Sequence, residues 1–169
     1  TVTATDPEGD TITFSISGSE ININSSTGVL TFASSPDYET KSSYTATVSV
    51  SDGGNSVNQN ITVNINNLND NAPSITSNAT FTVDENQTAI GTVTATDPDS
   101  DDITFSISGS EININSSTGV LTFASAPDYE TKSSYTATVT VSDGTNSTTQ
   151  DITVNINNLN DNAPSITSN

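Results

Sequence analysis

Short runs of alternating hydrophobic and polar residues extend along the whole chain. In the segment TITFSIS, Ile12, Phe14 and Ile16 fall on one face, and the segments YTATVSVS and ITVNIN follow the same pattern. Alternation with a period of two is typical of a half-buried β-strand, and no segment shows a convincing helical period. The pattern therefore predicts an all-β fold and outweighs the impression of disorder that a polar, highly charged composition gives.

The chain also repeats itself at an offset of 91 residues. Residues 1–78 align with residues 92–169 without a gap, and nine of the 78 aligned positions differ, which leaves 69 identities. A repeat of this length is long enough to form its own β-sandwich of about seven strands. We therefore expect tandem sandwiches rather than a solenoid.

One full period contains seven candidate strands separated by turn signals such as Asp97-Pro98, Thr118-Gly119 and Asp143-Gly144. Thr1 aligns with Thr92, so the first repeat lacks a counterpart of residues 79–91 and with it a whole first strand. The expected domains are repeat 1 at 1–71, repeat 2 at 72–162 and the start of a following repeat at 163–169. The expected strands cover residues 79–86, 88–97, 101–108, 111–115, 119–124, 134–143 and 149–158.

The charge of the chain restricts its chemistry. It has 20 acidic residues against two lysines, a formal charge of −18, and no histidine or cysteine. Nucleic acid and anionic lipid surfaces would repel such a chain. Without histidine or cysteine, only carboxylates and neutral oxygens remain as ligands, and these suit calcium or magnesium. No apolar run approaches the length of a membrane span, so we expect no membrane insertion in this segment.

Many of the acidic residues lie where strands meet loops. Two carboxylates at positions i and i+2 of an extended segment point to the same side, and two like charges about 4 Å apart repel by roughly 4 kcal/mol at an effective dielectric constant near 20. A single aspartate beside proline or glycine is ordinary turn chemistry. The combination of several pairs favours a bound cation.

The motifs VDEN, TDPD, PDYET, VSDG and NLNDNAP, in this cyclic order and spacing, resemble the five calcium motifs of cadherin repeats, in particular the cadherin-like repeats of bacterial surface adhesins. The resemblance covers essentially the whole chain. It implies immunoglobulin-like Greek-key β-sandwiches with Ca²⁺ bound at the junctions between successive repeats. The exact copy of NNLNDNAPSITSN at residues 66–78 and 157–169 is then explained as a repeated ligand set.

The resemblance also implies which residues bind the metal. For the internal junction they are Asp37, Glu39, Asn67, Asn69, Asp70, Asn71 (through its carbonyl), Asp97, Asp99 and Asp143. The half-site facing a preceding repeat has Asp6, Glu8 and Asp52. The half-site facing a following repeat has Glu85, Asp128, Glu130, Asn158, Asn160 and Asp161.

Two features depart from the pattern of the family. Asn67 and Asn158 stand where the family has aspartate, so each offers a neutral amide oxygen without a charge. The family's glutamate from the first strand is matched by Glu85 in repeat 2 but has no counterpart before Thr1. Whether Asp101 replaces an oxygen ligand of the family is left open. The six carboxylates of the internal junction would balance three calcium ions, bound at about 10⁻⁴ to 10⁻³ M as in extracellular modules.

These expectations lead to a non-enzymatic, calcium-rigidified stalk or spacer of an extracellular adhesin or surface filament. Its partners would be neighbouring repeats of the same chain or neighbouring subunits, together with a cell-surface or carbohydrate target. One alternative is a carbohydrate- or protein-recognition module using Tyr38, Tyr44, Tyr129 or Tyr135, although Tyr44 and Tyr135 fall on the alternating core face.

Two further alternatives remain. A glycosidase-like use of paired carboxylates is disfavoured because the pairs recur identically in both copies. A self-assembling fibre is the other, since an unpaired sheet edge in repeat 1 would accept a strand donated by another chain; a longer covalent array is favoured over it. Lys41 and Lys132 lie in a polar ETKSS loop, where we expect them to be solvated.

Overall fold

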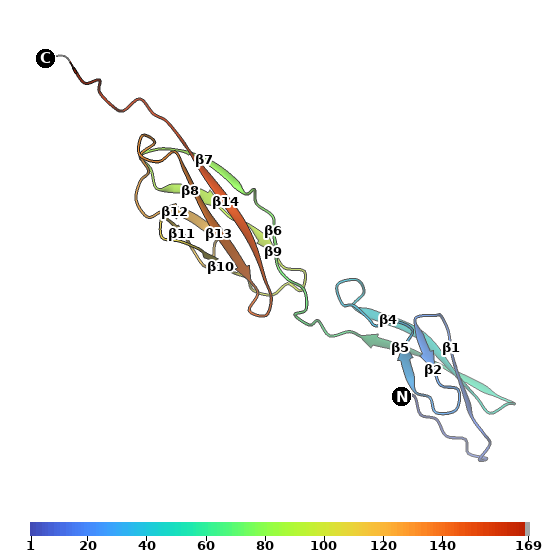
Figure 1. Cartoon of the computed structure of the whole chain (residues 1–169). Helices are drawn as coiled ribbons and strands as arrows, with labels where there is room; N and C mark the ends of the chain where they lie inside the picture. The colour runs from blue at the N-terminus through green and yellow to red at the C-terminus, as the bar shows by residue number, and fades with distance from the viewer. Residues whose placement is uncertain (168–169) are drawn as a thin grey trace. The chain divides into compact units, whose positions relative to one another are not determined.

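The computed structural model describes residues 1–167, and all regular structure within them is β-strand. The chain divides into two compact units (Figure 1): unit 1 is Thr1–Leu68 and unit 2 begins at Asn69. Each unit is built from two layers of strands, which agrees with the expected all-β sandwich class. In the part of the chain that the structure describes, no helix is long and apolar enough to cross a membrane.

The larger sheet of unit 2 has the strand order β10-β13-β14-β7. Its strands are β10 (Thr104–Ile107), β13 (Ser134–Ser142), β14 (Ser147–Asn157) and β7 (Thr80–Asp84). β13 pairs antiparallel with both β10 and β14, whereas β7 pairs parallel with β14. β14, the last strand of unit 2, therefore lies beside β7, which comes early in the unit (Figure 1).

The second sheet of unit 2 has the order β11-β12-β8, formed by β11 (Ile112–Ile114), β12 (Val120–Phe123) and β8 (Ala89–Thr92). A small ladder joins β6 (Ser74–Ile75) to β9 (Ala95–Thr96). The single strand expected over 88–97 is therefore two strands. Its first half pairs with β12 and its second half with β6, because the chain changes sheets between them.

The core of unit 2 lies between the two sheets. Alternate residues of β13 and β14 point inward, as the period-two pattern requires. The buried apolar side chains form one cluster: Val83, Ile90, Val93, Phe105, Ile112, Leu121, Phe123, Val139, Val141, Ile152, Val154 and Ile156.

Unit 1 has the same arrangement with fewer strands. One sheet has the order β1-β4-β5, with β1 (Thr13–Ile16), β4 (Ser43–Ser51) and β5 (Ser56–Asn64). The other pairs β2 (Ile21–Ile23) with β3 (Leu30–Phe32). Unit 1 contains no counterparts of β7 and β8, so its apolar interior opens into a groove of about 260 Å³, lined by Thr1, Ile21, Leu30, Thr31, Phe32 and Val63.

One glycine in each unit allows two backbone segments to approach each other closely at equivalent positions. At Gly119, φ is +68°, and an added Cβ would lie 2.2 Å from the Val93 carbonyl oxygen. Gly28 in unit 1 has φ of +66° and the same relation to the Val2 carbonyl oxygen. Only glycine fits these two positions without strain.

Candidate metal centre

Carboxylate and amide side chains gather at the end of unit 2 where the chain enters it. They come from three segments: the entry segment 69–73, the loop between β9 and β10, and the turn between β13 and β14. We call this group the linker-end cluster. Its members are Asn69, Asp70, Asn71, Asp97, Asp99, Asp101, Asp143 and Asn146.

Asp99 is the buried centre of the cluster, with only 3% of its surface exposed. Its Oδ2 accepts hydrogen bonds from the backbone N–H groups of Asp70 (3.2 Å) and Asn71 (2.8 Å), and its Oδ1 accepts one from Asn71 Nδ2 (3.0 Å). A buried carboxylate is tolerated when hydrogen-bond donors surround it. The carboxylate of Asp99 therefore attaches the entry segment to the β9–β10 loop.

Asp97 and Asp101 add two more carboxylates to the same loop. One carboxylate oxygen each of Asp97, Asp99 and Asp101 lies within 4.8 Å of the others. Asp97 Oδ1 accepts from the Asp101 N–H (3.2 Å), but Asp97 Oδ2 is buried without a hydrogen-bond partner. Desolvation, followed by the charges of Asp97, Asp99 and Asp143, raises the pKa of Asp101.

The backbone of this loop is also strained. Ser100 has φ of +66°, in the left-handed region, where an L-residue costs of order 1 kcal/mol. Repeat 1 has Gly9 at the corresponding position, with φ of +84°, so the conformation belongs to both copies. The turn bends the loop so that Asp99 and Asp101 face the same space as Asp97.

Asp143 is held by the turn that follows β13. Its Oδ1 accepts from the N–H groups of Thr145 (2.7 Å) and Asn146 (2.6 Å). Burial acts to raise the pKa of Asp143, but these hydrogen bonds, with contributions from the Asn146 and Asn69 side chains, outweigh it and lower the pKa. The Asp143 side chain is therefore ionised near neutral pH.

The residues of the linker-end cluster fit a hard cation. They supply several carboxylates, the Asn69 amide oxygen and the Asn71 carbonyl, all oxygen donors of the kind that Ca²⁺ prefers. The unpartnered Asp97 Oδ2 is a specific indication, because a buried carboxylate oxygen without a donor costs free energy. A bound calcium ion would satisfy that oxygen and offset the repulsion that raises the pKa of Asp101.

A second acidic group lies among the loops that adjoin the ends of β7 and β14. Glu85 is 2% exposed and accepts from the Tyr129 N–H (2.8 Å) and the Leu159 N–H (2.7 Å). Oxygens of Glu85, Asp128 and Glu130 lie within 4.8 Å of one another. A hydrogen bond from the Thr131 hydroxyl is the main cause of the lowered pKa of Asp128.

Asparagine amides surround this second group. Glu130 accepts hydrogen bonds from Asn158 Nδ2 (3.2 Å) and Asn162 Nδ2 (3.1 Å), and Asp161 accepts from Asn162 Nδ2 (2.8 Å) and Asn86 Nδ2 (2.5 Å). The structure thus places Glu85, Asp128, Glu130, Asn158 and Asp161 together in unit 2. Asn160 lies between Leu159 and Asp161 in the same segment.

In unit 1, Asp6 and Asp52 line one pocket of about 170 Å³. Asp6 Oδ1 accepts the Glu8 N–H (2.9 Å), and hydrogen bonds from the Asn55 and Gly54 N–H groups lower the pKa of Asp52.

The PDYET loop of unit 1 carries two further predicted ligands. The Asp37 carboxylate accepts from the Glu39 N–H (3.1 Å), and hydrogen bonding, led by Thr40, lowers its pKa. Asn67 lies just before Leu68, the last residue of unit 1.

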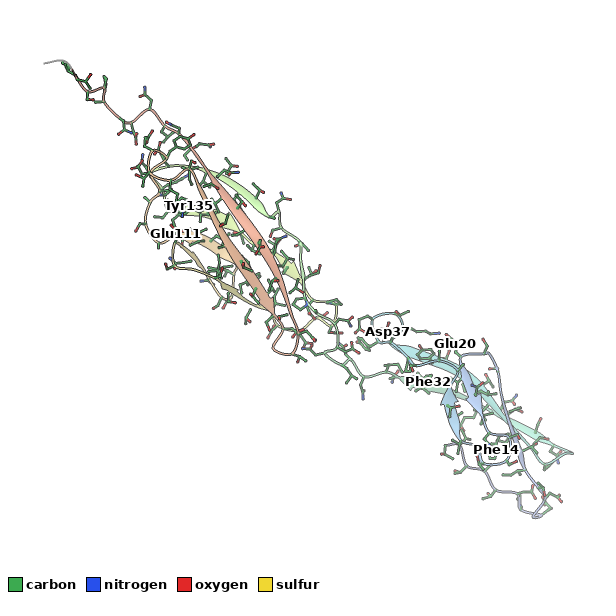
Figure 2. All side chains as sticks on the ribbon, in the orientation of Figure 1. Phe14, Glu20, Phe32, Asp37, Glu111 and Tyr135 are labelled. Carbon is green, nitrogen blue, oxygen red and sulfur yellow. The ribbon has the colours of Figure 1, made fainter. Side chains whose placement is uncertain are left out.

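The two lysines stay partly exposed to solvent, as expected from the sequence, but each also forms an ion pair and lies over an aromatic ring. Lys132 Nζ lies 2.7 Å from Glu111 Oε1 and 4.3 Å from the centre of the Tyr135 ring, and Lys41 has the same partners, Glu20 and Tyr44, in unit 1. Figure 2 shows Glu111 and Tyr135 close together in unit 2. The Lys132 N–H also donates to the Asp128 carbonyl, so the lysine fastens the acidic PDYET loop to the sheet.

Sequence reasoning missed three of the asparagines that contact the carboxylates, Asn86, Asn146 and Asn162. Asn146 reaches three oxygens of the linker-end cluster, and Asn86 and Asn162 reach Asp161. The available signal was the spacing in S-D-G-x-N, which both repeats share as Asn55 and Asn146. An uncharged side chain in a turn did not suggest a role until its partners were seen.

A family model described as "Cadherin domain" matches residues 79–157. The structure resembles protocadherin gammaB7 EC3-6 (TM-score 0.81, 27% identity, 94% of this chain and 43% of that chain). It also resembles mouse cadherin-23 EC22-24 (TM-score 0.78, 26%, 92% and 58%) and the human desmocollin-1 ectodomain (TM-score 0.73, 26%, 99% and 37%).

No curated protein sequence matches the chain. The chain spans between 37% and 58% of the length of the three solved structures. The first two of these structures comprise EC3-6 and EC22-24, and the third is an ectodomain.

Proposed function

Because the chain consists of cadherin-like repeats of the extracellular adhesion type, we propose that the linker-end cluster of unit 2 binds Ca²⁺ and that the bound ion stiffens the entry to the repeat. The repeats then serve as a stalk or spacer of a surface adhesin or filament, with no catalysis of their own. The bacterial setting of that adhesin remains a proposal from the sequence resemblance.

The observation that carries the proposal is the unpartnered Asp97 Oδ2 beside the carboxylates of Asp99 and Asp101. Three carboxylates held this close repel one another. Burying such a group without a counter-ion costs free energy, because the charges lose their hydration. A divalent cation supplies both the missing partner and the compensating charge. The raised pKa of Asp101 is a sign of the same repulsion.

Calcium would act by joining segments that are far apart in sequence. Asn69, Asp70 and Asn71 belong to the entry segment, whereas Asp97, Asp99 and Asp143 belong to loops of the folded sandwich. An ion bound by both sets restricts the motion of the entry segment. On the family resemblance, we further propose that Asp37, Glu39 and Asn67 of repeat 1 complete the ligand set at the junction.

The remaining predicted ligands belong to two half-sites, one at each end of the two-repeat chain. We propose that Glu85, Asp128, Glu130, Asn158, Asn160 and Asp161 form a half-site toward a following repeat, and that Asp6, Glu8 and Asp52 form one toward a preceding repeat. The domain boundaries at 71/72 and 162/163 are part of this proposal. The partners of the chain are then neighbouring repeats or subunits on the outside of a cell.

Calcium binding can be tested by the stability of unit 2. With a dissociation constant of about 0.1 to 1 mM, 10 mM calcium should raise the free energy of unfolding by about 1.4 to 2.7 kcal/mol for each site. We expect this rise in the chain of natural sequence and its loss in Asp97→Asn, measured by chemical denaturation in chelator and in calcium. Equal stability in both solutions for the unsubstituted chain would refute calcium binding.

Asp151→Asn is a matched control for charge. Asp151 lies on β14 and accepts a hydrogen bond from Thr138 Oγ1 (2.7 Å), and repeat 1 carries Asn60 at the same position, bonded to Thr47. The fold therefore accepts asparagine there. Asp151→Asn should keep the full calcium response; an equal loss in both variants would indicate general screening of negative charge instead of a site.

A further inference from the structure

The side-chain amide of Asn146 lies where several oxygens of the linker-end cluster converge. Asn146 Nδ2 donates to Asn69 Oδ1 (3.1 Å), to the Asn71 carbonyl (3.3 Å) and, at 3.5 Å, to Asp143 Oδ2. The last two oxygens can only accept hydrogen bonds, so the nitrogen of the amide, and not its oxygen, must face them. A group with partial positive charge thus points into a ring of acceptors.

These three oxygens belong to the predicted metal ligands. A calcium ion shared by them would need oxygens at 2.3–2.6 Å, and Asn146 Nδ2 is within hydrogen-bond distance of each of them. An ion that these oxygens bind on the side occupied by the nitrogen would overlap with it. The amide and the ion therefore exclude each other.

We propose that Asn146 is an internal competitor of the cation, which occupies the ligand oxygens in the metal-free protein and must turn away before the ion binds. The inference rests on the proposed calcium site. It adds a residue that sets the apparent affinity of that site without being one of its ligands. The apparent dissociation constant rises when only a fraction of molecules is in the open form.

The backbone at Asn146 can stay in place while the side chain turns. The Asn146 N–H donates to Asp143 Oδ1 (2.6 Å), and the Asn146 carbonyl accepts from the Asp143 N–H (3.3 Å) and from Ser142 Oγ (3.0 Å). None of these bonds involves the side-chain amide. Rotation about the side-chain torsions thus exchanges the amide for an ion without refolding the turn.

The competitor also accounts for a feature of the metal-free protein. Without a cation, the oxygens of Asn69 and Asn71 and Asp143 Oδ2 lie near one another and need another partner, because unpaired polar groups cost free energy. The two N–H groups of the amide are shared among these three oxygens and keep the entry segment close to the turn. The amide therefore stabilises the metal-free arrangement of these oxygens, and this stabilisation opposes the binding of the ion.

The substitution Asn146→Ala separates this role from that of a ligand. A competitor opposes binding, so its removal should tighten calcium binding by about fivefold to tenfold, the equivalent of one or two net hydrogen bonds. A ligand that presents its oxygen to the ion supports binding, so its removal should weaken it. The sign of the change distinguishes the two roles.

We would measure the affinity at this site by titrating the full 169-residue chain with calcium chloride and following the backbone amide signals of Asn71 and Gly144 by NMR. In the unsubstituted chain, the Asn146 side-chain NH₂ signals should shift during the same titration. Asn113→Ala, the same change at an exposed position on β11, is the control and should leave the affinity unchanged.

The outcomes are distinguishable. Tighter binding in Asn146→Ala with no change in Asn113→Ala supports the competitor. Weaker or unchanged binding in Asn146→Ala, or NH₂ signals of Asn146 that do not move with calcium, overturns it and leaves the calcium site intact. No calcium response at Asn71 or Gly144 in either the unsubstituted chain or Asn146→Ala overturns the calcium site itself.

Discussion

Single carboxylates of the chain differ in how the fold treats their charge. The pKa of Asp101 is raised by desolvation and by neighbouring negative charges, whereas hydrogen bonds lower the pKa of Asp128 and Asp143. A raised acid pKa means that the folded state disfavours the charged form. Near neutral pH, Asp101 therefore destabilises the metal-free fold, while Asp128 and Asp143 stabilise it.

This difference predicts the effect of Asp101→Asn in chelator. At pH 7 the variant should unfold at higher denaturant concentration than the unsubstituted chain, because the repulsion is gone. As pH falls through the folded-state pKa of Asp101 toward its ordinary value of 3.8, the unsubstituted chain becomes protonated and the gap should close. Denaturation curves of unit 2 at several pH values measure it. A variant less stable than the original at pH 7 would contradict the prediction.

The lowered pKa values act in a lower pH range. The stability that Asp128 and Asp143 contribute is present above 3.8, their ordinary value, and is lost as pH falls below it through their folded-state values. The two effects are therefore separated by pH. As pH falls, the fold first gains stability because protonation of Asp101 relieves the repulsion. It then loses stability at lower pH, when Asp128 and Asp143 become protonated.

At this scale the sequence indicated which charged residues to examine but not all of their neutral partners. Asp97, Asp99 and Asp143 were expected in one site from their motifs. In unit 2, Asp97 and Asp99 lie together with Asp101, and the charge of Asp143 acts on Asp101, but the role of these residues as metal ligands stays a prediction. The position of Asp101 was left open and is now seen beside Asp97 and Asp99. Asn146 was missed because its contacts depend on residues 75 and 77 positions away in the chain.

At the scale of elements, the turn between β11 and β12 depends on one glycine. Gly119→Ala should reduce the free energy of unfolding by about 3 kcal/mol, since it combines left-handed backbone with a Cβ that meets the Val93 carbonyl oxygen at 2.2 Å. Gly144→Ala has the left-handed conformation alone, with no atom within 4 Å, and should cost about 1 kcal/mol. Chemical denaturation compares the two; equal losses would show that the contact is relieved by a small shift of the loop.

The limits of prediction at this scale lie in strand partners. The alternating runs predicted β10, β13 and β14 well, because each stays in one sheet along its length. The run over 88–97 has the same alternation, yet it divides into β8 and β9, which pair with different strands. Alternation reports which face of a strand is buried, and it carries no information on which neighbour supplies the hydrogen bonds.

At the scale of the whole molecule, the two units have nearly the same sequence but different cores. The buried apolar residues of unit 1 are Phe14, Ile21 and Val48, and the groove beside β3 remains open. Unit 2 buries the twelve residues of its cluster because β7 and β8 cover the same surface. The sequence repeat predicted two sandwiches of one class, and the structure agrees on the class; the exact domain boundaries stay a prediction.

This difference predicts two unfolding transitions for the 169-residue chain, with unit 1 unfolding first because it buries less apolar surface. Val48 and Val139 are equivalent residues, both 0% exposed, so they form a matched pair. Val48→Ala should reduce the free energy of unfolding of unit 1 by about 2 kcal/mol and so lower the temperature of the first transition. Val139→Ala should have the same effect on unit 2 and the second transition. Calorimetry measures both. A single transition lowered by either substitution would mean that the units unfold together.

The parallel pairing of β7 with β14 also determines how unit 2 resists tension. The chain enters unit 2 at Asn69, forms the short strand β6 and then β7, and leaves the sandwich at the end of β14. Five residue pairs, from Thr80–Thr153 to Asp84–Asn157, connect β7 and β14. Because the strands run in the same direction, a pull on the two ends of the domain slides one strand along the other. The hydrogen bonds of this ladder are then loaded in shear, all together, and do not open one after another as in a zipper.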